Sequence, residues 1–168
     1  EYAVADSTFG NSVVVAQAPR LTVAPDGSRV WAVFDGTTAF GFDRRPDGSY
    51  SAMVGRTETL TADPYAGTFT LIDSTGQVFT FNDFSTSLAA GLRGRVTKID
   101  HPGGGTTTYS YDSAGVLLSF TRDGVVNGLP TAARVTYTYL PGGVNAGKAA
   151  GATLAESANG GPWVTVGT

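Results

Sequence analysis

The sequence predicts an all-β protein, an antiparallel β-hairpin meander of short strands in a curled or extended sheet, with little or no helix. Two observations support this prediction. Apolar and aromatic residues alternate with polar ones in run after run, and a period of two suits a pleated, half-buried strand. Turns rich in Gly, Pro and Asp separate these runs, and 23 Gly and 8 Pro in 168 residues make turns frequent. Chained hairpins of this kind form a meander.

The alternating runs mark the expected strands in chain order. They are RVWAVF (29–34), TAFGF (38–42), TFTLI (68–72), QVFTF (77–81), TTYSY (107–111) and RVTYTY (134–139). The segment 85–94 forms one short helical turn at most, and its glycines favour a loop. The Gly-rich end still contains two short expected strands, ATLAES (152–157) and PWVTV (162–166).

Turn signals lie between the runs. The Asp-Gly pairs in PDG (25–27), DG (35–36) and PDG (46–48) predict type I′ turns, in which both central residues have positive φ. The stretches DSTG (73–76) and DSAG (112–115) predict longer turns of the same kind.

Length and charge restrict the classes of protein. We expect one module over 1–168, with a lead-in arm at 1–19, hairpin repeats at 20–140 and a Gly-rich continuation at 141–168. Only 15% of the residues are charged, so Thr, Ser and Gly must form much of the surface, or more protein covers it. A net charge of −3 without a basic stripe argues against nucleic acid. No apolar run reaches the roughly 18 residues that span a bilayer, so we expect no membrane insertion.

A loose internal repeat consists of aromatic pairs whose two rings share one face of a strand, since side chains alternate. The pairs are Phe40/Phe42, Phe79/Phe81, Tyr109/Tyr111 and Tyr137/Tyr139. Asp43, Asn82 and Asp112 follow the first three pairs. We expect each to begin a turn by accepting hydrogen bonds from backbone amides further along the chain.

The stretch from Tyr111 and Asp112 through Gly115 to Val116 and Leu117 resembles the repeat of the YD-repeat, or Rhs-repeat, family. That repeat is a Tyr-Asp pair, two residues, a glycine and an alternating apolar strand. The resemblance implies a bacterial, secreted or cell-surface β-shell in which the repeats are non-enzymatic scaffold. It also implies partners that are further copies of the chain or adjacent repeats. In that family the shell often encloses a C-terminal toxin domain, which here would lie outside this chain.

The sequence offers no catalytic, cofactor-binding or metal-binding set. His101 is the single histidine and lies in a turn, where we expect a solvated side chain, and there is no cysteine. The aspartates lie mostly in turns, where bonding to backbone amides accounts for them, so an enzyme such as a glycan hydrolase is the weakest alternative.

The two tryptophans bear on a second alternative, a carbohydrate-binding module that mediates attachment. Trp31 alternates with Val30 and Ala32, and we expect it to pack in the core. Trp163, in GGPWVTV, is the candidate for an exposed ring that stacks on a glycan.

Overall fold

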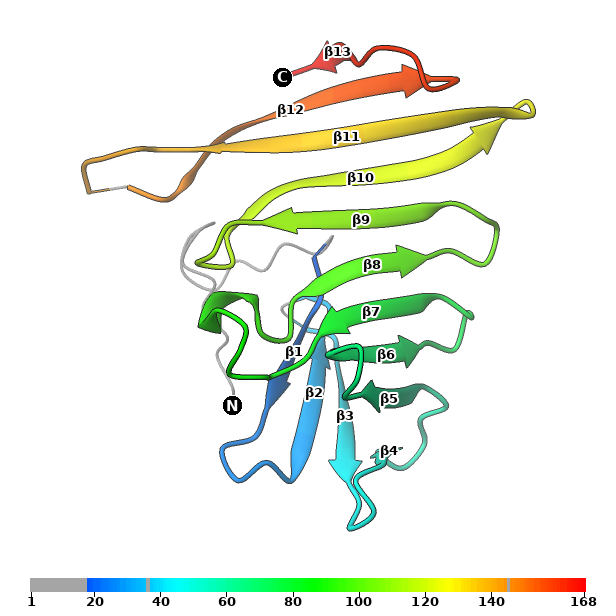
Figure 1. The fold of residues 1–168 in the computed structure, drawn as a ribbon, viewed down its shortest axis with the longest axis vertical. Helices are drawn as coiled ribbons and strands as arrows, with labels where there is room; N and C mark the ends of the chain where they lie inside the picture. The colour runs from blue at the N-terminus through cyan, green and yellow to red at the C-terminus, as the bar shows by residue number, and fades with distance from the viewer. Residues whose placement is uncertain (1–17, 36, 145) are drawn as a thin grey trace.

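The structure, a computed structural model, describes residues 18–35, 37–144 and 146–168. Within them the prediction of an all-β antiparallel meander is confirmed. Four strands form one sheet in the order β1-β2-β3-β4, and nine form a second sheet in the order β13 to β5 (Figure 1). The described residues include a single helical element, the three-residue 3-10 turn η2 (Ala90–Leu92), inside the predicted loop.

We call these the small sheet and the long sheet. The small sheet consists of β1 (Arg20–Val23), β2 (Arg29–Val33), β3 (Ala39–Arg44) and β4 (Tyr50–Ala52). The first part of the long sheet consists of β5 (Thr59–Asp63), β6 (Thr68–Ile72), β7 (Val78–Asn82), β8 (Val96–Asp100) and β9 (Thr106–Tyr111). Its second part consists of β10 (Leu117–Val126), β11 (Leu129–Tyr139), β12 (Ala149–Ala158) and β13 (Val164–Gly167). Strands β10 to β12 have ten or eleven residues, which exceeds the short strands that the sequence predicts.

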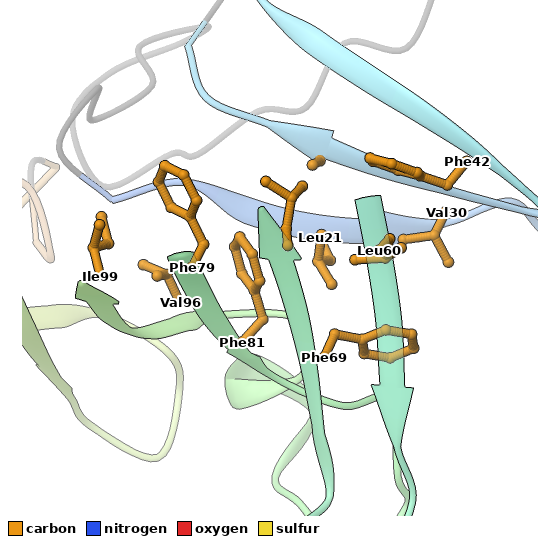
Figure 2. Close-up of a cluster of buried hydrophobic side chains, with 11 residues drawn as sticks. Leu21, Val30, Phe42, Leu60, Phe69, Phe79, Phe81, Val96 and Ile99 are labelled. Atoms are coloured by element: carbon orange, nitrogen blue, oxygen red, sulfur yellow. The ribbon is translucent and has the colours of Figure 1, made fainter. Parts of the chain in front are cut away.

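The hydrophobic core lies between the two sheets, at one end of the long sheet only. The small sheet runs across β5 to β8, while β10 to β13 extend away from it (Figure 1). The core side chains of the small sheet point at those of β5 to β8 (Figure 2). The cluster comprises Leu21, Val30, Ala32, Phe42, Leu60, Phe69, Leu71, Phe79, Phe81, Val96 and Ile99.

One edge of this two-layered part is fixed through the backbone. The Leu21 amide donates to the Gly94 carbonyl at 2.7 Å, and Arg20 forms an isolated antiparallel bridge with Arg95. Gly94 has a φ of 68°, and a Cβ at this position would overlap the Leu21 carbonyl oxygen. Only glycine therefore allows β1 to approach the loop before β8 so closely.

The opposite, outer face of the long sheet is rich in hydroxyl groups. Pairing registers place one residue from each strand in a single transverse row, and six of the nine are threonines. The row is Thr61, Thr70, Thr80, Lys98, Thr108, Thr121, Arg134, Ala155 and Thr165. Threonine suits a strand and offers a hydroxyl to water, so this face can be solvated although the chain has few charged residues.

The prediction of type I′ geometry for the Asp-Gly turns is wrong where the structure describes them. Gly27 and Gly48 have positive φ, but the preceding Asp26 and Asp47 do not. Each aspartate instead accepts a hydrogen bond from the backbone amide two residues on, at 3.0 and 2.9 Å. Gly36 of the 35–36 pair and residues 1–17 of the predicted 1–19 arm lie outside the described ranges.

A two-residue turn with two positive φ values joins β10 to β11 instead. Asn127 and Gly128 have φ values of 53° and 79°, between the paired residues Val126 and Leu129. Asn-Gly is the dipeptide that this turn prefers, so the signal was present in the sequence.

Two further predictions at the small sheet are wrong. Trp31 was expected in the core but lies on the outer face of β2, since its neighbours Val30 and Ala32 fill the core. Its ring is half-buried, and the Arg29 guanidinium lies over it, 5.4 Å from the ring centroid. Asp43 does not begin a turn, because β3 continues through it and its carboxylate pairs with Arg29 Nε at 2.6 Å.

Candidate functional site on the inner face of the long sheet

The aromatic pairs of the predicted repeat line the inner face of the long sheet and the facing side of the small one. Phe42 and Phe81 are fully buried, and Phe79 is nearly so. Phe40 packs at the edge of the same cluster. Phe79 and Phe81 stack with their centroids 6.3 Å apart, and Figure 2 shows both directed toward the small sheet. The first two pairs therefore hold the two layers together.

The inner face continues beyond the small sheet as a row of aromatic rings. Registers place Tyr109, Phe120, Val135 and Leu154 side by side on β9 to β12. The Phe120 ring lies 6.0 Å from that of Tyr109 and 6.4 Å from that of Tyr137. Sequence reasoning missed Phe120 because it belongs to no aromatic-x-aromatic pair, although its alternation with the polar Ser119 and Thr121 marks it as a residue of the apolar face.

Further apolar side chains are exposed at the borders of the same face. Val126 is 58% exposed and Leu129 is 53% exposed, at the far ends of β10 and β11. On the last strand, Val164 and Val166 are 59% and 52% exposed. Exposed apolar side chains on a face that no second layer of described residues covers are a usual mark of an interaction site.

The second members of the two tyrosine pairs have structural roles. The Tyr139 hydroxyl donates to the Leu117 carbonyl, joining β11 to β10. The Tyr111 ring lies under the Arg95 guanidinium, 5.8 Å from its centroid, and its buried hydroxyl makes no hydrogen bond with the described residues. Burial raises the pKa of Tyr111 and raises the pKa of Tyr109 to about 12.

The Asp112–Gly115 turn is built as the sequence predicts. The Asp112 carboxylate accepts hydrogen bonds from the amides of Ala114 and Val116, both at 2.9 Å. Gly115 has a φ of 81°, and a Cβ there would overlap the carbonyl oxygen of Gly91, which sits in η2. This turn thus docks, backbone to backbone, on the loop before β8. Gly91 was not singled out from the sequence, since a glycine in a loop gives no sign of its partner.

A groove of about 920 Å³ lies beside the aromatic row, toward the Asn127-Gly128 turn. Small residues form its floor, among them Gly124, Ala133 and Ala158. Arg122 and Glu156 stand on either side of Ala133 in one register row, and both are exposed. No ion pair joins either of them to another described residue. The site therefore combines the aromatic row with a groove that is lined by one charge of each sign.

Trp163 lies apart from this site, just before β13. Its ring is 39% exposed, and the Arg134 guanidinium of the outer face lies over it, 4.3 Å from the centroid. An arginine stacked on an indole is a favourable cation–π pair, so one face of the ring already has a partner.

His101 is not the solvated side chain that the sequence suggests. It is half-buried, and its Nε2 lies 2.9 Å from the Thr107 hydroxyl, so it connects the turn after β8 to β9. Across the described ranges, no three His, Asp or Glu side chains come together in a way that could hold a metal ion. The same part of the chain contains no helix long and apolar enough to cross a membrane.

Comparison with protein-family models, curated proteins and solved structures found no match to this chain. Its fold and site define an all-β meander protein in which one end of a nine-stranded sheet is covered by a second layer. The other end presents an apolar inner face.

Proposed function

We propose that this chain is a non-enzymatic structural module of an extracellular or cell-surface β-shell of the YD/Rhs-repeat kind, which works by assembling with more protein. The observation that carries the proposal is the inner face of β10 to β13, which the small sheet does not cover (Figure 1). The aromatic row continues the side that is buried in β5 to β8, so this row has side chains of the kind that fill the core. A face of this kind is stabilised when further protein covers it.

The aspartates support a scaffold role. Asp26, Asp47, Asp73 and Asp112 each accept hydrogen bonds from backbone amides of their own turns. A carboxylate used in this way holds a hairpin in shape, whereas a catalytic carboxylate must face a substrate. The role we assign to the module is to cover, display or polymerise, and a shell of this kind can enclose a toxin domain outside this chain.

Light scattering after size exclusion and negative-stain images test the proposal with variants of the exposed rim. The double variant Leu129→Lys/Val164→Lys places two charges on the inner face at positions more than half exposed, so the fold tolerates them. We expect the wild-type chain to form assemblies and this variant to remain monomeric. Val125→Lys, on the opposite face and 70% exposed, is the matched control and should assemble as the wild type does. A wild-type chain that stays monomeric at all concentrations contradicts the proposal.

Glycan binding is the second candidate function, and Trp163 is the observation in its favour. A partly exposed indole near a sheet edge is a surface on which a sugar ring stacks. Titration of tryptophan fluorescence with a panel of oligosaccharides tests it. Binding should quench the emission of the wild type and of Trp31→Phe, and should leave that of Trp163→Phe unchanged. A panel that quenches none of them removes this candidate.

A further inference from the structure

We propose that the inner face of β10 to β13 packs on the same face of a second copy of this chain, as a dimer whose two-fold axis runs along β11. The inference rests on the proposed function, since it names the partner of the same face and the geometry of the contact. Three observations carry it: the area of the face, the placement of its two charges, and the arrangement of its large and small side chains.

The area is that of a stable interface. With strands spaced about 4.8 Å apart and a rise of about 3.3 Å per residue, the lengths of β10 to β13 give a face of about 550 Å². Two such faces bury about 1,100 Å², which exceeds the roughly 1,000 Å² that a specific protein–protein interface needs. Two stacked twisted sheets then align their strands within about 30°.

The charges are self-complementary about the proposed axis. Ala133 lies on β11, with Arg122 opposite it on β10 and Glu156 opposite it on β12. The two charged side chains are thus one strand to either side of the axis, about 10 Å apart at the backbone. Rotation about β11 exchanges the two sides, so Arg122 of each copy faces Glu156 of the other. A two-fold contact of this kind makes every pair twice.

The apolar side chains are also complementary about the same axis. In the next inner-face row, Phe120 of one copy lies opposite Leu154 of the other, and Val135 lies opposite its own symmetry mate. The groove over Gly124 and Ala133 leaves room for the long charged side chains between the sheets. Burial of the apolar rows drives association, whereas the ion pairs select the register, because desolvation offsets most of their attraction.

Sedimentation of the full chain over a range of concentrations, with charge-reversal variants, tests the dimer. Arg122→Glu and Glu156→Arg each place like charges opposite one another twice, and we expect each to raise the dissociation constant about tenfold or more. The combined Arg122→Glu/Glu156→Arg variant restores opposite charges at both contacts, and we expect it to return within about threefold of the wild-type value. Asp123→Arg, an exposed reversal on the outer face next to Arg122, is the control and should leave association unchanged.

The outcomes separate this inference from the proposed function. Recovery in the combined variant establishes the face-to-face register. If both single reversals associate as the wild type does, or if the combined variant is not restored, the proposed dimer is wrong. Loss of association in Leu129→Lys/Val164→Lys would still support the scaffold role in that case. A wild-type chain that is monomeric throughout removes both.

Discussion

Strands β5 to β8 and strands β10 to β13 follow the same alternation but differ in what covers them. The small sheet packs on the first group and buries Leu60, Leu71, Phe81 and their neighbours. On the second group, the equivalent side of the sheet leaves Phe120 and Tyr137 only partly buried. One strand pattern therefore serves either as half a core or as a surface for a partner. The difference arises from whether a second layer exists, which no single strand encodes.

The largest expected effect comes from truncating one aromatic ring in each of the two regions. Phe81→Ala removes a fully buried side chain and should cost about 3–5 kcal/mol of unfolding free energy. Phe120→Ala removes a partly buried ring and should cost about 1 kcal/mol. Denaturant unfolding of both variants at one protein concentration measures the difference. Equal losses would mean that β10 to β13 are as well packed as the core.

A second comparison concerns two glycines with positive φ. At Gly115 a Cβ would also overlap the Gly91 carbonyl, whereas nothing lies within 4 Å of a Cβ at Gly128. Gly128→Ala should cost about 1–2 kcal/mol from backbone conformation alone. Gly115→Ala should cost clearly more, because the turn must also separate from the loop before β8. Thermal unfolding of both variants tests this order, and the reverse order would place the Asp112–Gly115 turn outside the structural framework.

Alkaline pH should act on the tyrosines of the inner face, of which Tyr109 packs against the core. Burial, and then the neighbouring Tyr137, raises the pKa of Tyr109 to about 12, and burial also raises the pKa of Tyr137. A phenol whose folded pKa lies above its ordinary value of 10 stabilises the fold fully below pH 10. That contribution is lost as the pH rises from 10 toward about 12. Thermal midpoints across this range should fall, and the fall should be smaller in Tyr109→Phe, which keeps the ring but cannot ionise.

Acid should act on the small sheet, with the smallest effect of the four. The Ser28 amide lowers the pKa of Asp26, the Thr37 amide lowers that of Asp35, and the Ser49 hydroxyl lowers that of Asp47. A carboxyl with a depressed pKa stabilises the fold above its ordinary value of 3.8, and this contribution is lost as the pH falls below it. Thermal midpoints measured from about pH 5 to about pH 2 should decline. Asp26→Asn keeps the acceptor oxygen without the charge and should reduce the slope; an unchanged slope would contradict the assignment.

The sequence predicted the fold class because alternation and turn residues are local properties. The strand pairs, the Asp112–Gly115 turn and the placement of Phe79 and Phe81 all follow from them. Trp31 was assigned to the wrong face because alternation shows only that two faces differ, not which one is buried. That choice depends on the second sheet, and both Trp31 and its neighbours are apolar.

The candidate site was predictable only in part. The tyrosine pairs were visible, but the row that they form with Phe120 depends on registers between strands, and a bulge between Leu117 and Ser119 shifts one of them. Arg122 and Glu156 lie 34 positions apart in the sequence, and only the β10-β11-β12 pairing brings them to one row. Gly91 and Gly115 are also distant in the sequence, so their positions in the sequence do not predict that they come into contact.

The long sheet has the same order in space as along the chain, so each of its strands has only its sequence neighbours beside it. Such a sheet can form one hairpin at a time, with little loop-closure entropy at each step. The same order makes it a fold that tolerates growth. A duplicated hairpin placed after β13 would leave every existing strand pair in place, so the sheet can lengthen without a change to its core.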